Sequence, residues 1–230
     1  MTNKITDIFF DLDHTIWDFE ANSKLAFEKL LNKNKIEISI DDFLKIYEPI
    51  NKNYWDRYAQ AIITKKEVKY GRLIDTFSTL NIAVDDDFIN KFASDYLDFL
   101  KEETILMDGT IEILEYLFPK YRLHILTNGF IEIQNQKIIN SKLDKYFIEV
   151  ISSEEIGKQK PHPEVFNYAL KKANTSSYKS IMIGDNFKSD ILGARNVGMQ
   201  AIFYDIAQQN LVEDKIIPSI KHLSELRNLL

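Results

Sequence analysis

Near its start the chain reads Ile5-Thr6-Asp7-Ile8-Phe9-Phe10-Asp11-Leu12-Asp13-His14-Thr15. The apolar run in this segment is short and ends abruptly in acidic residues, which is typical of a buried parallel strand. Polar residues that directly follow such a strand lie at the carboxyl edge of a parallel sheet, where α/β proteins bind their ligands. The segment therefore predicts the first strand of an α/β fold, with functional carboxylates at its end.

Later segments repeat this pattern of an apolar run followed by small or polar residues. They are residues 121–126, 180–183 and 200–204, with residues 147–151 as a weaker candidate. Helical spacing of apolar residues occurs between them, over residues 110–118, 163–173 and 189–196. Strands that alternate with helices predict a Rossmann-like parallel sheet with helices on both faces.

Residues 17–103 follow a different pattern, because they contain no clear buried strand. Helical patterns cover residues 23–31, 41–58, 66–80 and 86–100, and acidic residues near the expected helix starts suit the helix dipole. We therefore expect an α/β catalytic core made of residues 1–16 and 104–230. An all-helical domain, residues 17–103, interrupts this core directly after its first strand.

Composition excludes several classes of function. The 230 residues include no cysteine, so disulfides and thiolate chemistry are impossible, and the formal net charge of −6 argues against nucleic-acid binding. No apolar run approaches the roughly 20 residues that span a membrane, and the first residues lack the pattern of a signal peptide. We expect a cytoplasmic protein with no membrane or nucleic-acid partner, and the sequence leaves its oligomeric state open.

The polar residues expected at the strand ends and in the loops next to them form a specific set. They are Asp11, Asp13, Thr15, Thr127, Asn128, Lys160, Asp185 and Asp190. Converging carboxylates repel one another unless a cation lies between them, and oxygen ligands favour Mg²⁺. A carboxylate can attack phosphorus, and a lysine with the metal can neutralise the transferring phosphoryl group. The set thus indicates Mg²⁺-dependent hydrolysis of a small phosphorylated substrate.

Four motifs in this order resemble those of the haloacid dehalogenase superfamily of phosphohydrolases. They are Asp11-Leu12-Asp13-His14-Thr15, Leu126-Thr127-Asn128, Lys160-Pro161, and Gly184-Asp185 followed by Asp190. The resemblance implies a nucleophile and metal ligand at Asp11, and a general acid/base at Asp13 whose backbone carbonyl is a second metal ligand. It assigns the phosphoryl oxygens to Thr127, Asn128 and Lys160. It assigns the metal to Asp185 as well, with Asp190 as an outer-shell carboxylate or a partner of Lys160, and it makes the helical block a domain that closes over the substrate.

One departure narrows the resemblance, because most members of the superfamily have glycine where this chain has His14. The stretch from His14 to Ser23, with Asn51 and Trp55, is similar to noncanonical pyrimidine nucleotidases. That likeness implies a nucleoside monophosphate substrate such as dUMP or dTMP. We expect at least one aromatic residue to stack on the base, from a set made of Trp17, Phe19, Tyr54, Trp55 and Tyr58.

Other functions remain open in principle. The same core suits a phosphatase for phosphoglycolate or a sugar phosphate, because the motifs set the chemistry and the inserted domain sets the substrate. A dehalogenase is disfavoured because that branch lacks a carboxylate at the position of Asp13. A phosphomutase would use the same aspartyl-phosphate, a signalling receiver module would lack the helical block, and a catalytically inactive binding protein would not need all four motifs.

Overall fold

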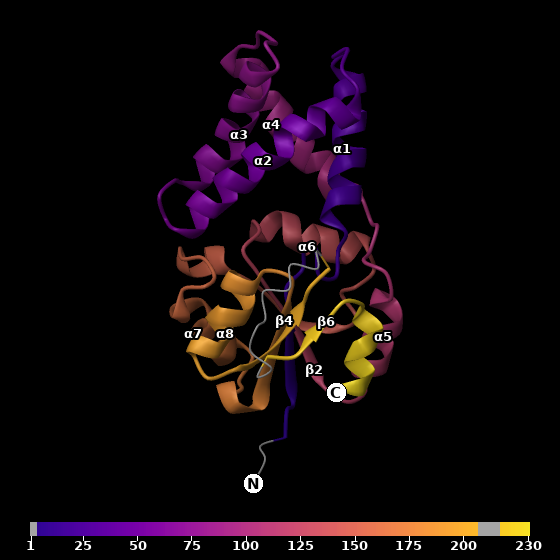
Figure 1. Cartoon of the computed structure of the whole chain (residues 1–230), viewed down its shortest axis with the longest axis vertical. Coiled ribbons are helices and arrows are strands. Elements are labelled where there is room, and N and C mark those ends of the chain that lie inside the picture. Colours follow the sequence, from indigo (N-terminus) through magenta and orange to yellow (C-terminus); the bar gives the residue numbers. More distant parts are fainter. Residues whose placement is uncertain (1–3, 207–216) are drawn as a thin grey trace. The chain divides into compact units, whose positions relative to one another are not determined.

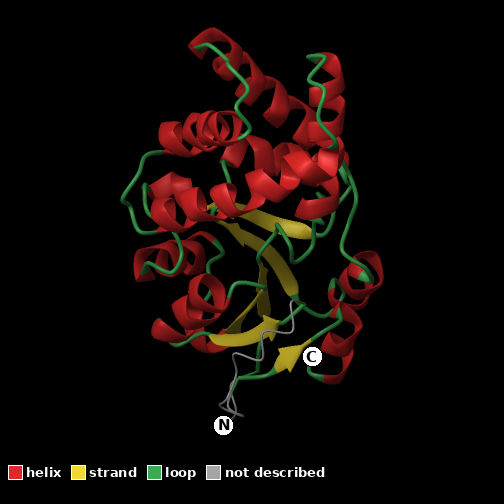
Figure 2. Cartoon of the chain, turned by 45° about the horizontal axis from the view of Figure 1, so that its top comes forward, coloured by secondary structure: helices red, strands yellow, loops and turns green. Residues whose placement is uncertain are grey.

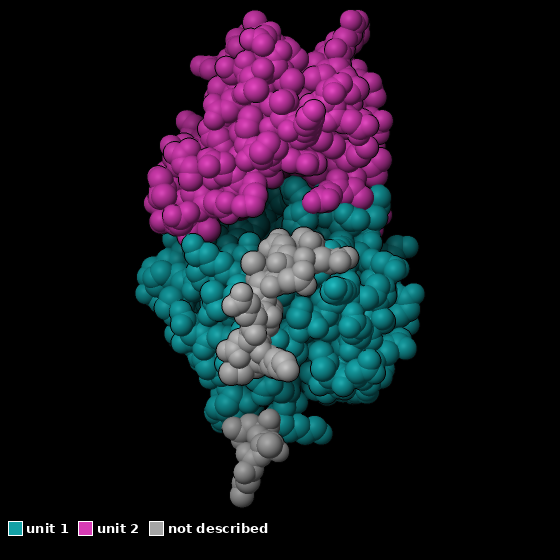
Figure 3. All heavy atoms as spheres, viewed as in Figure 1, with its two compact units in different colours: residues 1–19, 105–230 teal, residues 20–104 magenta. Residues whose placement is uncertain are grey.

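A computed structural model describes residues 4–206 and 217–230 of the chain. Within these residues the chain forms two compact units (Figure 3), one from the residues up to Phe19 and from Ile105 onward, the other from Glu20–Thr104. The two backbone segments that lead into and out of the second unit are paired with each other. The amide of Asp18 donates to the carbonyl of Ile105 over 3.1 Å, and Trp17 bridges to Leu106.

The first unit is built on a parallel sheet of six strands. In chain order the strands are β1 (Asp7–Phe10), β2 (Arg122–Thr127), β3 (Phe147–Ser152), β4 (Ser180–Gly184), β5 (Gln200–Tyr204) and β6 (Ser219–Ile220). Their order across the sheet is β3-β2-β1-β4-β5-β6, and every neighbouring pair is parallel. The predicted α/β fold class is therefore confirmed. The order places β1 between β2 and β4, where the direction of winding reverses and α/β proteins bind ligands.

Helices cover both faces of the sheet (Figures 1 and 2). They are α5 (Thr110–Leu117), α6 (Ile131–Asn140), α7 (Pro163–Lys172) and α8 (Gly193–Asn196), with the π-helix η3 (Phe187–Leu192) and the short 3-10 turns η1 (Ser153–Ile156), η2 (Ser177–Lys179) and η4 (Leu223–Asn228). On one face, Val165 and Phe166 of α7, with Ala194 of α8, pack on Phe9 and Met182 of the central strands. Burial of each large apolar side chain contributes about 1.5–3 kcal/mol.

Several elements of this unit differ from the sequence prediction, among them the two-residue strand β6, which was not predicted. Residues 189–196 were predicted as one short helix, but the chain forms the π-helix η3 followed by α8. The side chain of Asn186 accepts from the amide of Ser189, and Asp190 accepts from the amide of Asn186, so side chains shape the first turn of η3. Helix α6 was not predicted, because two of its buried residues, Gln134 and Lys137, are polar.

The second unit contains the four long helices that the sequence indicated. They are α1 (Phe19–Lys33), which begins one residue before the unit, α2 (Ile40–Ala59), α3 (Lys65–Thr79) and α4 (Asp86–Glu102). Side chains cap three of them, and α3 has a full capping box between Thr64 and Glu67. The core of the second unit is aromatic: Phe27 of α1 stacks on Tyr96 of α4 with ring centroids 4.1 Å apart. Among the residues that the structure describes, none of the helices has the length and apolarity to cross a bilayer.

Candidate active site

Three adjacent strands direct polar residues to the same edge of the sheet. Asp11 follows β1, Thr127 is the last residue of β2, and Asp185 follows β4. Because β1 pairs with both β2 and β4 in register, these residues, far apart in sequence, meet at the carboxyl edge. Thr15 reinforces the arrangement: its hydroxyl donates to Oδ1 of Asp185 over 3.2 Å and accepts from the amide of Asp185 over 3.1 Å.

Lys160 is the cation of this site, and its side chain is only 2% exposed. Its Nζ donates to Oδ1 of Asp11 over 2.6 Å, to Oδ1 of Asp190 over 2.7 Å and to the carbonyl of Leu126 over 2.7 Å. An ammonium has three donors, so this geometry uses all of them. Burial alone would lower the pKa of Lys160, but the facing Asp11 and Asp190 carboxylates outweigh it and raise that pKa.

Three carboxylates converge beside this lysine. One oxygen from each of Asp11, Asp185 and Asp190 lies within 4.8 Å of the other two. Burial, with the charge of the neighbouring carboxylates, raises the pKa of Asp11 well above its usual range and that of Asp185 to about 7. One lysine does not neutralise three carboxylates, so the cluster favours an added cation. An all-oxygen donor set with a carboxylate excess fits Mg²⁺.

Asn186 and Gly184 hold Asp190 in this cluster. The amide of Asn186 donates to Oδ2 of Asp190 over 3.1 Å. A Cβ added at Gly184 would lie 2.2 Å from the same oxygen, so only glycine leaves room for the carboxylate. A π-helical turn of this kind is frequent at functional sites.

The carboxylate of Asp13 faces a different set of partners and does not join the three-carboxylate cluster. Nζ of Lys137 donates to Oδ1 of Asp13 over 2.7 Å, and Nε2 of Gln134 donates to Oδ2 over 2.8 Å. Both donors come from α6, one helical turn apart. Sequence reasoning missed Gln134 and Lys137; the available signal was a pair of polar residues at i and i+3 between the apolar Ile133 and Ile138.

Thr127 and Asn128 have protein partners of their own. The hydroxyl of Thr127 accepts from the amide of Gly129 over 3.0 Å and from Nε2 of Gln134 over 2.8 Å. Asn128 makes reciprocal hydrogen bonds with the backbone of Lys160, accepting from its amide over 2.8 Å and donating to its carbonyl over 3.1 Å. Asn128 therefore anchors the loop that carries Lys160, and its predicted contact with a phosphoryl group stays a prediction.

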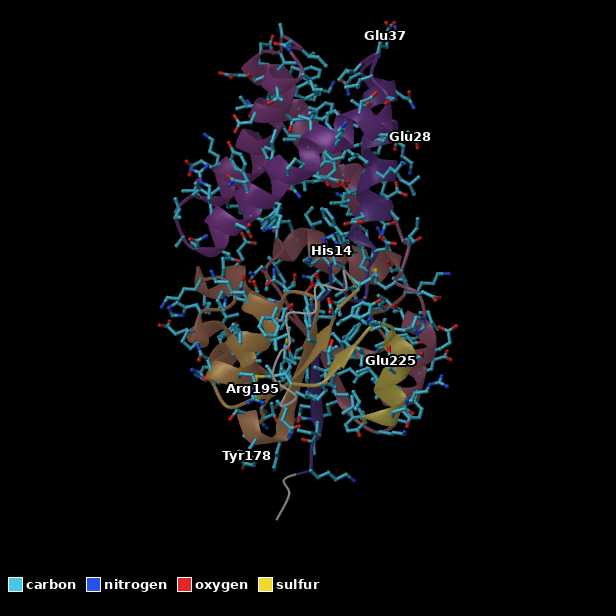
Figure 4. All side chains as sticks on the ribbon, in the orientation of Figure 1. His14, Glu28, Glu37, Tyr178, Arg195 and Glu225 are labelled. Carbon is cyan, nitrogen blue, oxygen red and sulfur yellow. The ribbon has the colours of Figure 1, made fainter. Side chains whose placement is uncertain are left out.

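His14 (labelled in Figure 4) has a left-handed backbone conformation with φ 64°. Glycine adopts this conformation without strain, and histidine is one of the residues that tolerates it. The His14 amide donates to the carbonyl of Trp17 over 2.9 Å, which closes the loop after Asp13. Glycine would fit this position without strain, so the backbone here does not depend on the imidazole.

Two of the aromatic residues proposed to stack on a base lie in the first unit. Trp17 is fully buried, and Nζ of Lys137 lies 3.9 Å from the centroid of its ring. Trp17 is therefore a packing residue in this structure and does not present a face to a ligand. Phe19 is partly exposed, and its ring lies 5.1 Å from that of His14.

The features that resembled nucleotidases in the helical domain lie in the second unit. Asn51 accepts from Nη1 of Arg72 over 2.5 Å and from the hydroxyl of Tyr47 over 3.3 Å. Arg72 is 2% exposed, and its guanidinium lies against the rings of Tyr47 and Tyr96. Asn51 thus has a clear role in the packing of this unit. Trp55 is partly exposed and makes an edge contact with Tyr58.

Comparison with known proteins agrees with this geometry. The family model for haloacid dehalogenase-like hydrolases matches residues 8–204. Pyrimidine 5'-nucleotidase YjjG of Escherichia coli is 29% identical over 97% of this chain and 96% of its own length. Glyceraldehyde 3-phosphate phosphatase of Methanothermobacter thermautotrophicus is 27% identical over 95% of this chain and 98% of its own length.

A solved structure of a relative has the same fold. The crystal structure of the putative HAD-hydrolase YfnB from Bacillus subtilis, bound to magnesium, matches with a TM-score of 0.88 and 29% identity, over 99% of each chain. The chain therefore belongs to the haloacid dehalogenase-like hydrolases, and it is a phosphohydrolase of that family.

Proposed function

We propose that the chain hydrolyses pyrimidine nucleoside 5'-monophosphates through an aspartyl-phosphate on Asp11, with Mg²⁺ as cofactor. The observation that carries the chemistry is the contact of Lys160 with both Asp11 and Asp190, beside the three-carboxylate cluster. This arrangement supplies a nucleophile with a fixed orientation and a cation for the charge of the transferring group.

The reaction proceeds in two half-reactions. In the first, the carboxylate of Asp11 attacks phosphorus as the bond to the leaving oxygen breaks; the leaving oxygen keeps the electron pair and takes a proton from Asp13. In the second, water attacks phosphorus and gives a proton to Asp13, and the electron pair of the breaking bond returns to Asp11. Inorganic phosphate is released, and Asp13 has regained its proton.

The remaining residues orient the nucleophile and bind the phosphoryl group and the metal. Lys160 fixes Asp11 through Oδ1, and Thr127 and Asn128 are assigned to the phosphoryl oxygens. Asp11, Asp185 and Asp190, with the backbone carbonyl of Asp13, would hold Mg²⁺. When bound there, the metal supplies positive charge that stabilises the phosphoryl group during its transfer.

The substrate assignment is supported by a local likeness and by a match over nearly the whole chain. The sequence around Asp13 and His14 is similar to pyrimidine nucleotidases, and YjjG, which matches nearly the whole chain, is named a pyrimidine 5'-nucleotidase. The second candidate substrate is a small phosphorylated sugar or acid, because a glyceraldehyde 3-phosphate phosphatase also matches nearly the whole chain.

The test is phosphate release from dUMP, dTMP, UMP, AMP, phosphoglycolate and glyceraldehyde 3-phosphate, with Mg²⁺ and with EDTA. We expect the pyrimidine monophosphates to give the highest kcat/KM, and we expect EDTA and the Asp11→Asn variant to abolish turnover. A preference for glyceraldehyde 3-phosphate with the same two dependences would refute the nucleotidase assignment alone. Full activity of Asp11→Asn would refute the mechanism.

A further inference from the structure

The second half-reaction needs a base in a fixed orientation, and the environment of Asp13 indicates how the chain provides one. Both oxygens of its carboxylate accept hydrogen bonds from α6, one from the ammonium of Lys137 and one from the amide of Gln134. Donors on both oxygens leave the carboxylate little rotational freedom.

Lys137 is buried in a way that packing alone does not explain. Its side chain is 2% exposed, whereas that of Asp13 is 23% exposed. Burial of an ammonium costs several kcal/mol unless it is paired. The ring of Trp17, 3.9 Å from Nζ, recovers part of this cost through a cation–π contact. A methionine of similar shape would fill the same space at a lower cost but could not donate to Asp13.

Gln134 links this contact to the phosphate-binding strand. Its Nε2 donates to Asp13 and also to the hydroxyl of Thr127, each over 2.8 Å, so both amide hydrogens are used. A Cβ added at Gly129 would lie 2.3 Å from Nε2, and the glycine therefore leaves the space that Gln134 occupies. The orientation of Asp13 is thus tied to the end of β2.

We propose that Lys137, assisted by Gln134, is a positioning residue for hydrolysis of the phosphoenzyme: the two hydrogen bonds hold the carboxylate of Asp13 in one orientation, in which it takes a proton from the attacking water. The inference rests on the proposed function, because it needs an aspartyl-phosphate on Asp11. It assigns Lys137 no contact with the substrate. It also separates the roles of the two buried lysines, since Lys160 contacts the nucleophile and Lys137 contacts the acid/base.

The experiment uses p-nitrophenyl phosphate, whose leaving group departs without a proton. Its kcat/KM reports formation of the phosphoenzyme and does not depend on Asp13 as an acid, whereas decay of the phosphoenzyme depends on Asp13 as a base. We expect Lys137→Met to slow that decay by about 10- to 100-fold. This is no more than the lower end of the roughly 100- to 10,000-fold that a general base contributes, because the variant keeps Asp13 and loses only one of its two donors. Rapid acid quench measures the decay directly. In steady state, kcat and KM should fall together while kcat/KM stays within about threefold of wild type, and a burst of one p-nitrophenol per enzyme should appear.

Controls separate positioning from a structural role. Lys137→Arg keeps the charge and the donors and should restore most of the decay rate. Gln134→Met, which removes the second donor without changing a charge, should slow the decay by a smaller factor. Lys171→Met replaces an exposed lysine of α7 and should match wild type.

The possible outcomes are distinct. An unchanged decay rate in Lys137→Met, or a loss confined to kcat/KM with no burst and no rescue by Lys137→Arg, would overturn the inference. If Asp11→Asn forms the same amount of phosphoenzyme as wild type, the proposed function has failed, and not the role of Lys137. Circular dichroism establishes that each variant is folded. We expect Lys137→Met to be as stable as wild type, because the carboxylate that it leaves is partly solvated.

Discussion

Replacement of Asp185 by asparagine should make the metal-free protein more stable. Ionisation of Asp185 in the folded chain is opposed by its burial and by the charge of Asp190, and its pKa rises from 3.8 to about 7. This difference corresponds to a loss of about 4 kcal/mol in the free energy of unfolding at pH values above 7. The amide has the same shape, and its oxygen can still accept from the hydroxyl of Thr15. We therefore expect Asp185→Asn to gain about 2–4 kcal/mol in EDTA at pH 8, or roughly 5–10 °C in thermal midpoint.

The sign of the pH dependence follows from the direction of the shift. Between pH 3.8 and about 7 the folded chain binds more protons at Asp185 than the unfolded chain does, so the contribution of this group to stability falls as the pH rises. The difference between variant and wild type should be largest at pH 8 and should shrink by pH 5. Mg²⁺ should stabilise the wild type, by about 2.7 kcal/mol at 100 times its Kd, and should stabilise the variant much less.

Thermal unfolding in EDTA and in Mg²⁺, at pH 5 and pH 8, measures all of these quantities. Asp144→Asn removes an exposed carboxylate of the same unit and controls for the change in net charge. Its thermal midpoint should equal that of wild type under all four conditions. A variant that melts at or below the wild-type temperature in EDTA at pH 8 would refute the reasoning. A stability difference between Asp185→Asn and wild type that is the same at pH 5 and pH 8 would also refute it.

Three further changes test other parts of the site and the core. Gly184→Ala should lower kcat/KM by about 100-fold, because the new Cβ, 2.2 Å from Oδ2 of Asp190, must displace that carboxylate by about 1 Å; a loss below tenfold in steady-state kinetics would contradict this. Lys160→Met should cost about 3–5 kcal/mol of unfolding free energy in EDTA, since buried carboxylates lose their cation, and urea titration measures it. Burial raises the pKa of Asp7, but hydrogen bonds from neighbours such as His124 outweigh it and lower that pKa. The contribution of Asp7 to the free energy of unfolding is thus complete above pH 3.8 and is lost as the pH falls below this value. Asp7→Asn should therefore flatten the acid limb of a plot of unfolding free energy against pH.

Much of the fold could be predicted because burial and polarity change sharply along this chain. Strand β1 is buried throughout and is followed at once by Asp11, so both its existence and the position of the site could be predicted. Helices α2, α3 and α4 of the second unit were predicted with bounds within a few residues, and acidic or hydroxyl residues cap them. Helix α1 begins four residues before the predicted start. Strands β2 and β4 end in Thr127 and Gly184, β5 is followed by Asp205, and all three were found in the same way.

The parts of the site that escaped prediction are those where a polar residue is buried, and the two-residue strand β6 was too short to show a pattern. Helix α6 turns Gln134 and Lys137 inward, so its apolar residues do not show helical spacing. The partners of Asp13 lie 121 and 124 positions away in sequence, and no local pattern connects them. The π-helix depends on hydrogen bonds between Asn186, Ser189 and Asp190, which contribute nothing to hydrophobic periodicity.

The pairing of the two backbone segments around the inserted unit has a consequence for how such a protein can diversify. Asp18 is bonded to Ile105, and Trp17 bridges to Leu106, so the inserted residues leave and re-enter the first unit at neighbouring points. The entropic cost of closing such a loop grows only slowly with its length. Changes to the gene could therefore exchange, lengthen or shorten the segment between these points, while the strand register and the cluster of Asp11, Asp185 and Asp190 stay as they are. The inserted unit and the strands that carry the carboxylate cluster are, in this sense, encoded in separable parts of the gene.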